Sequence, residues 1–208
     1  MSLGIDVIYS GLYSPEMART KAFSPHDALS TAAALFWDLG YEKTSLDTLM
    51  SETGVARQSL YDTFGDKRSL YLKALAHYRD TSQAQLRRLF ASGHPIRKCF
   101  SKLLLGIAAE SKAAHLRGCL LLSANLEREA RDKTISDLLK ENQAQVEGIF
   151  RDALQRARET GDLPADRDPD ALARFFLVTI QGMRSTARVH SNRAALEQVA
   201  RVALAALG

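Results

Sequence analysis

Four hydrogen-bonding side chains gather on one side of a short predicted helix, and they are Gln58, Ser59, Tyr61 and Asp62. At about 100° of rotation per residue, Gln58 and Asp62 point away from the apolar Leu60, and Ser59 and Tyr61 flank them. Amide, hydroxyl and carboxylate groups on the outer side of a helix can form hydrogen bonds with base edges in a DNA major groove. The alternative is a surface helix whose polar residues only face solvent.

A longer predicted helix precedes this polar segment. Ser24 is placed to cap its first turn, Pro25 suits the first helical position, and Asp27 complements the positive end of the helix dipole. Apolar residues then recur at helical spacing, and Gly40 supplies a conformation at which helices commonly end. We therefore expect a helix over residues 25–39.

Two shorter helices are predicted next. The sequence Thr44-Ser45-Leu46-Asp47 has the form of a capping box with Asp in the acidic position, and the helix that starts there ends before Gly54. Another helix is expected over residues 56–64. Two short helices joined by a tight glycine turn, behind a longer helix, describe a helix-turn-helix. This arrangement would place the polar side chains on the outside of a small domain.

The residues from Gly40 to Lys67 resemble the signature of the TetR/AcrR family of bacterial regulators. The most specific match is the pattern Ser-Leu-Tyr-x-x-Phe-x-x-Lys, which runs from Ser59 to Lys67. The resemblance implies an all-α fold. It also implies an N-terminal three-helix helix-turn-helix domain that binds DNA and a larger C-terminal helical domain for ligand binding and dimerisation.

The resemblance further implies which side chains contact DNA. The start of the second helix matches phosphate-contacting positions, and the third helix matches positions that read bases or contact the backbone. The first residue of the following helix matches a phosphate clamp. The DNA-contacting residues implied in this way are Thr44 and Ser45 (phosphate), Arg57 and Gln58 (bases), Ser59, Tyr61 and Thr63 (backbone or base edges) and Lys67 (phosphate).

Two acidic residues depart from the family's pattern. Asp47 stands where some members carry a basic residue that contacts a base, so that contact is absent or replaced by helix capping. Asp62 would repel phosphate but could accept a hydrogen bond from cytosine; otherwise it is solvated or pairs with Arg57. Seven acidic residues outnumber six basic ones between positions 17 and 70. Because nonspecific affinity should then be weak, we expect a homodimer on an inverted repeat of double-stranded operator DNA.

Three segments are predicted along the chain: an N-terminal extension at residues 1–16, the DNA-binding domain at 17–66, and the effector-binding and dimerisation domain at 67–208. The last of these should contain helices near residues 67–91, 95–111, 118–127 and 133–160. The resemblance implies that they and the helix expected over residues 169–189 enclose a pocket for a small hydrophobic or amphipathic effector. Candidate pocket residues, each of which could instead be plain core, are Tyr78, Phe90, Phe100, Leu104, Cys119, Leu121, Phe150, Phe176 and Met183.

Two C-terminal helices carry the signal for dimerisation. They are expected over residues 169–189 and 193–207, and each has apolar residues at helical spacing. Gly182, Ala187, Ala200 and Ala203 would let helices approach closely, and an interior glycine otherwise costs about 1 kcal/mol of helix stability. The resemblance implies that this pair forms a four-helix bundle between subunits. The same residues could also belong to the core of one subunit.

The composition is that of an ordinary globular protein. The chain has 208 residues, of which 46% are hydrophobic, and a formal charge of +4. Only two cysteines occur, and neither forms a CxxC pair, which favours a reducing compartment. No apolar stretch approaches the length of a membrane span, and the N-terminus has no signal-peptide pattern. The sequence therefore predicts a cytoplasmic protein without a membrane partner.

No catalytic motif is evident. The five histidines are scattered, and there is no HExxH sequence, nucleophile elbow or phosphate-binding loop. We therefore expect no enzyme activity, no cofactor and no metal site. The resemblance to the TetR/AcrR family implies instead a repressor that a small molecule releases from DNA. Two alternatives remain at this point: a regulator that senses thiol oxidation or a soft metal through Cys99, Cys119 and His115, and a helical enzyme or carrier.

Overall fold

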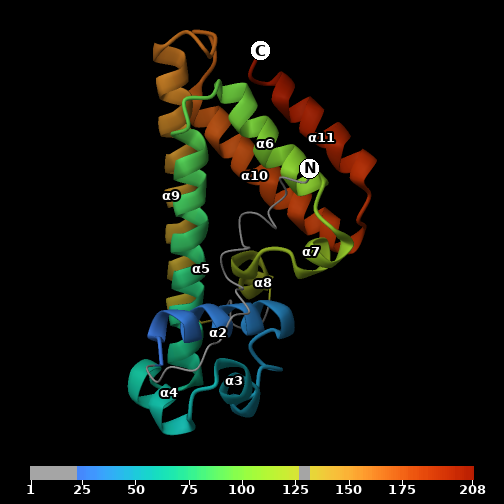
Figure 1. Ribbon diagram of the computed structural model, residues 1–208. Coiled ribbons are helices and arrows are strands. Elements are labelled where there is room, and N and C mark those ends of the chain that lie inside the picture. The colour runs from blue at the N-terminus through green and yellow to red at the C-terminus, as the bar shows by residue number, and fades with distance from the viewer. Residues whose placement is uncertain (1–22, 127–131) are drawn as a thin grey trace.

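The computed structural model describes residues 23–126 and 132–208, and every regular element in these ranges is a helix (Figure 1). The all-α prediction is therefore confirmed. The predicted N-terminal extension at residues 1–16 lies outside the described residues. None of the helices in the described ranges combines the length and the apolar character needed to cross a membrane.

The helices follow one another with short connections. In chain order they are α2 (Pro25–Leu39), α3 (Leu46–Thr53), α4 (Arg57–Phe64), α5 (Lys67–Phe90), α6 (Ile96–Ala108), α7 (Lys112–Arg117), α8 (Leu120–Leu126), α9 (Lys133–Glu159), α10 (Pro169–Val189) and α11 (Arg193–Ala205). The predicted helices all occur, with ends shifted by a few residues. Helix α7 was not predicted, because six residues are too few to show an apolar period.

Side-chain caps define the first turns of the helix-turn-helix region. Ser24 accepts a hydrogen bond from the backbone N–H of Asp27, as its position in the sequence predicts. The capping residue of α3 is Ser45, which accepts from the N–H of Thr48, so the predicted capping box is displaced by one residue. Gly54 ends α3 with a left-handed φ of 68°, which glycine adopts without strain.

The lower part of Figure 1 contains one hydrophobic core, which we call the lower core. It joins α2, α3 and α4 to the first half of α5, to α8 and to the start of α9. Its buried residues are Ala28, Ala32, Ala33, Phe36, Leu49, Val55, Leu60, Phe64, Leu70, Tyr71, Ala74, Leu75, Tyr78, Leu120, Leu121, Ala124, Ile135 and Leu139. Buried apolar surface thus continues past residue 66, where we placed the end of the DNA-binding domain.

A second hydrophobic core, the upper core, lies between α6, α9, α10, α11 and the end of α5. Its buried residues are Phe90, Ile96, Cys99, Phe100, Leu103, Leu104, Ile107, Ala108, Ile149, Phe150, Ala153, Leu154, Ala157, Leu163, Leu172, Ala173, Phe176, Met183, Ala187, Leu196, Ala200, Ala203, Leu204 and Leu207. Helix α5, with 24 residues, contributes to both cores and connects them.

Candidate nucleic-acid interface

The outward side of α4 is polar and accessible, as the sequence predicts. Leu60 and Phe64 face the lower core with 2% and 5% exposure, whereas Arg57, Gln58 and Ser59 are exposed. Helices α3 and α4 lie side by side at the end of the molecule opposite the C-terminus (Figure 1). A helix presented in this way, with its polar side free, has the form needed to enter a major groove.

Both side chains expected to read bases are held by carboxylates. Nη2 of Arg57 lies 3.2 Å from Oδ1 of Asp47, which belongs to α3. Nε2 of Gln58 donates to Oδ1 of Asp62 at 2.8 Å, one turn further along α4. The suggested pairing of Asp62 with Arg57 is therefore wrong, because Asp62 accepts from Gln58 and Arg57 pairs with Asp47 instead. Asp47, which could have capped α3, instead contacts Arg57 at the start of α4.

The start of α3 offers one accessible hydroxyl where two were expected. Ser45 is exposed, and its Oγ lies at the helix N-terminus, where backbone N–H groups favour an anion. Thr44 has 0% exposure, and its Oγ1 donates to the carbonyl oxygen of Gly40 at 2.7 Å. Because this hydroxyl is buried in the turn after α2, the predicted phosphate contact of the Thr44 side chain does not fit its placement.

Lys67 is held beside this surface at the start of α5. Its Nζ lies 4.4 Å from the centre of the Tyr41 ring and 3.5 Å from the carbonyl oxygen of Glu42. These contacts limit the side chain to the edge of the helix-turn-helix, where a cation can meet a DNA backbone. Tyr61 is 40% exposed on the same end of the molecule, and Thr63 is half-buried.

Lys73 forms hydrogen bonds with the C-terminal end of α4, a contact that the sequence did not reveal. Its Nζ donates to the carbonyl oxygens of Thr63 and Phe64, both at 3.2 Å. These carbonyl oxygens lie at the C-terminal end of α4, where a positive charge is favourable. The only sequence signal was a lysine nine residues after the end of a predicted helix, which does not specify a contact across the turn.

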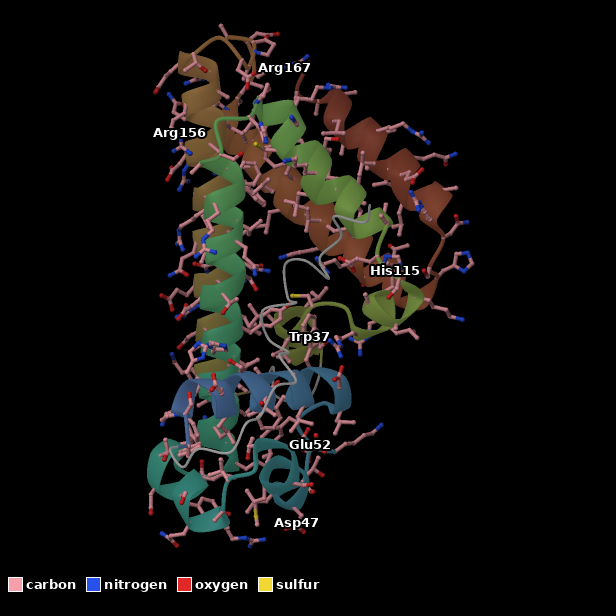
Figure 2. All side chains as sticks on the ribbon, in the orientation of Figure 1. Trp37, Asp47, Glu52, His115, Arg156 and Arg167 are labelled. Atoms are coloured by element: carbon pink, nitrogen blue, oxygen red, sulfur yellow. The ribbon has the colours of Figure 1, made fainter. Side chains whose placement is uncertain are left out.

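A polar junction connects the helix-turn-helix to the segment of residues 112–123, which contains α7 and the start of α8. Nε1 of Trp37 donates to the carbonyl oxygen of Gly118 at 3.1 Å, and Nε of Arg117 pairs with Oδ1 of Asp38. The Arg117 guanidinium also lies 4.9 Å from the centre of the Trp37 ring. Figure 2 shows Trp37 between α2 and α8. We call this contact set the junction.

The other side of the same segment is attached to the C-terminal helices. His115 is 2% exposed, and its ring nitrogens lie 2.8 Å from the carbonyl oxygen of Ile107 and 2.6 Å from Oγ of Ser191 (Figure 2 labels His115). Nη1 of Arg188 on α10 donates to Oγ of Ser123 at 2.8 Å. The segment therefore contacts α2 on one side and the ends of α6 and α10 on the other.

The structure does not bring the predicted pocket residues together. Tyr78 and Leu121 belong to the lower core, and the half-buried Cys119 packs against it. The other candidates lie in the upper core, where four phenylalanine rings contact one another. The ring-centroid distances are 4.8 Å for Phe90–Phe100, 5.3 Å for Phe90–Phe150, 5.4 Å for Phe100–Phe150 and 3.9 Å for Phe100–Phe176. Leu104 and Met183 are also buried there.

The suggested thiol or metal sensor is not assembled in this structure. Cys99 lies in the upper core, and Cys119 packs against the lower core. Burial raises the pKa of the Cys99 thiol, which disfavours the reactive thiolate. His115 contacts a carbonyl and a hydroxyl. No group of three or more metal-ligating side chains occurs within residues 23–126 and 132–208.

The sequence matches two family models. One, described as bacterial regulatory proteins of the tetR family, matches residues 28–74, and one, described as the tetracyclin repressor-like C-terminal domain, matches residues 100–203. The chain is 33% identical to YezE of Bacillus subtilis, an uncharacterized HTH-type transcriptional regulator, over 92% of this chain and 100% of the relative. It is 29% identical to the transcriptional repressor ComR of Escherichia coli over 88% of each chain.

Solved structures agree with these matches. A cysteine variant of the TetR family regulator CifR, in complex with a 26 bp operator duplex, is 29% identical with a TM-score of 0.75. The alignment covers 92% of this chain and 100% of that one. A TetR family regulator from Cytophaga hutchinsonii has the same fold, with a TM-score of 0.76 at 17% identity. The chain therefore belongs to the TetR family and is a DNA-binding transcriptional regulator.

Proposed function

We propose that this protein is a repressor that binds an inverted-repeat operator as a homodimer and leaves it when a small hydrophobic or amphipathic effector binds. Base contacts come from Arg57 and Gln58. Phosphate or further base-edge contacts come from Ser45, Ser59, Tyr61, Thr63 and Lys67. The observation that carries the proposal is an exposed polar face on α4 in a chain whose α10 and α11 expose several large apolar side chains.

The apolar face supports a homodimer. Phe175 and Val178 on α10 are 42% and 65% exposed, and Val199 and Val202 on α11 are 45% and 75% exposed. Side chains of this kind normally become buried in a stable interface. A second copy of the chain would cover them by placing the same two helices against their equivalents, which is how two-fold dimers form.

Gly182 supports the same arrangement. It is exposed on α10, and a Cβ added there would meet nothing within 4 Å in its own chain. Packing within one subunit therefore gives no reason for an interior glycine that costs about 1 kcal/mol of helix stability. Close approach of a partner helix provides one. Ala187, Ala200 and Ala203, in contrast, are buried in the upper core and serve the subunit itself.

The segment of residues 112–123 offers a path for effector control. A ligand that changes the separation of α6 and α10 would displace His115, which contacts Ile107 near the end of α6 and Ser191 just after α10. It would also move Arg188 of α10, which binds Ser123 on α8. Because Gly118 and Arg117 contact Trp37 and Asp38, the displacement would reach α2 and alter the spacing of the two recognition helices. The ligand acts by preferring the conformation that does not fit the operator.

Selection of DNA from a random pool tests the proposal. The wild-type protein should select an inverted repeat whose half-sites are about one helical turn apart or a multiple of it. Arg57→Ala should relax preference at one base position in each half-site. Lys67→Ala should weaken all sites alike and reduce the salt dependence. Lys102→Ala, on the exposed side of α6, is the control and should change neither property. Selection of no sequence would overturn the proposal.

The effector is tested with the selected operator. A set of hydrophobic and amphipathic compounds is screened for release of the labelled duplex, and active compounds are titrated while tryptophan fluorescence is recorded. Trp37 is the single tryptophan in the chain, so its emission reports on the junction. Release with a matching fluorescence change is the expected result. Release without any change in emission would mean that the junction is not the path.

A further inference from the structure

We infer that Asp47 and Asp62 are positioning residues for base recognition, and that the same two charges suppress binding to DNA of unrelated sequence. The inference rests on the proposed function of α4. Its basis is a repeated arrangement: each of two adjacent side chains on the outer face of α4 has its own carboxylate partner. One carboxylate comes from α3 and the other from α4 itself.

The contact between Asp47 and Arg57 leaves the guanidinium able to read a base. The side chains are 84% and 58% exposed, so both are present at the surface that would face DNA. A guanidinium has five N–H donors, and the contact with Asp47 uses one of Nη2. Two further N–H groups suffice for the O6 and N7 atoms of guanine. Asp47 thus restricts the direction of Arg57 without using the donors that a base requires.

The contact between Asp62 and Gln58 selects an orientation of the amide. Because Nε2 donates one N–H to Asp62, the amide cannot rotate freely, and its oxygen and second N–H have defined positions. Adenine recognition needs one donor and one acceptor from glutamine, and both remain. A side chain that is held in its binding orientation loses less conformational freedom when it meets a base.

Both carboxylates also oppose the phosphate backbone. Affinity for DNA of any sequence comes mainly from positive charges near phosphates, so two exposed negative charges on this surface reduce it. At the correct bases, hydrogen bonds from Arg57 and Gln58 compensate for this loss of affinity. Incorrect bases do not form these bonds, so the loss remains. The two acids therefore raise the ratio of specific to nonspecific affinity in two ways: they position the side chains that read bases, and they weaken binding to any phosphate backbone.

The experiment compares alanine and amide variants at each position. Asp47→Ala removes both the acceptor and the charge, whereas Asp47→Asn keeps an oxygen that can accept from Arg57 and removes only the charge. Asp47→Ala should reduce base discrimination about two- to fivefold at the position that Arg57→Ala also affects, in keeping with an exposed ion pair. Asp47→Asn should keep most of it. Both variants should raise affinity for unrelated duplex about twofold at low salt.

The Asp62 variants test the same effect at the other base position, the one assigned to Gln58. Asp62→Ala should relax preference only at the position that Gln58→Ala affects, and Asp62→Asn should restore most of it. Glu52→Ala is the matched control, because Glu52 is an exposed acid on α3 about 140° around the helix from Asp47. Figure 2 shows these two side chains on different sides of α3. The control should leave base preference unchanged.

Three results would overturn the inference. Asp47→Ala could keep the full preference of the wild type, it could weaken every position equally, or it could act in an Arg57→Ala background as strongly as alone. In each case Asp47 does not act through Arg57. Thermal unfolding of each variant is measured alongside. Equal unfolding midpoints would show that a change in base preference comes from altered DNA recognition and not from lost stability. A wild-type protein that selects no sequence would instead refute the proposed function.

Discussion

The lower and upper cores show two ways in which one helical chain prepares a function. The lower core is covered by α2, α3 and α4, of which α2 and α3 have side-chain caps, and the proposed functional groups lie outside it, on the exposed side of α4. The upper core lies between α6, α9, α10 and α11 and contains a cluster of contacting phenylalanine rings. Its proposed functions, effector binding and dimerisation, depend on the core itself and on the face of α10 and α11.

This difference explains why motifs identify one region and not the other. Base recognition needs particular polar groups at particular positions, so the residues of the helix-turn-helix are recognisable in the sequence. A hydrophobic core needs volume and apolar character, and many residue combinations provide both. For the lower region, we can therefore propose which atoms contact DNA, whereas for the upper region we can propose only the chemical class of the effector.

The largest expected effect is the loss of the central ring of the upper core. Phe100 has 0% exposure and stacks on Phe176. Phe100→Ala should lower the free energy of unfolding by about 3–5 kcal/mol, measured by urea denaturation. Leu105→Ala is the control, because Leu105 lies on the same helix and is 38% exposed. If both variants unfold at the same urea concentration, the phenylalanine cluster is not the centre of this core.

An intermediate effect is expected for dimerisation, which the upper region provides and on which operator binding by the lower region depends. Val178→Asp places a charge on the apolar face of α10 and should weaken dimerisation by about 2 kcal/mol or more. Sedimentation velocity would show the dissociation, and operator affinity should fall in parallel because each half-site needs a subunit. Lys140→Asp, at an exposed position of α9, is the comparison. A monomeric variant with unchanged operator affinity would show that DNA binding by the lower region does not depend on dimerisation by the upper region.

The smallest expected effect is the pH dependence of the lower core. Burial, and next the nearby His26, lower the pKa of His77; Asp80 opposes the shift, and Oγ of Ser30 lies 3.1 Å from Nε2 of His77. Between the ordinary value of about 6.5 and the lowered pKa of the folded protein, the unfolded chain then binds more protons than the folded one. The free energy of unfolding should therefore decrease as pH falls from 7 toward 5.

His77→Gln should flatten this part of the stability curve, measured as urea denaturation at several pH values. The exposed His190 provides the control, and His190→Gln should leave the slope as it is in the wild type. A slope that persists unchanged in His77→Gln would show that the pH dependence arises elsewhere in the fold.

Local signals predicted most of the fold. Ser24, Pro25 and Gly40 define the bounds of α2 because caps, proline and glycine act within one turn of the residue that carries them. The polar face of α4 followed from helical spacing around Leu60. Helix α7 was missed for the same reason, since six residues contain too little of the pattern from which a helix is predicted.

The amino-acid sequence by itself determined every described helix except α7, the family resemblance and the identity of the polar face, because these depend on residues close together in the chain. Only the tertiary structure decided that Asp47 binds Arg57, that Thr44 is buried and that Trp37 contacts Gly118. It also divided the predicted pocket residues between two cores. Such contacts depend on how helices pack against one another, and one-dimensional spacing does not specify that packing.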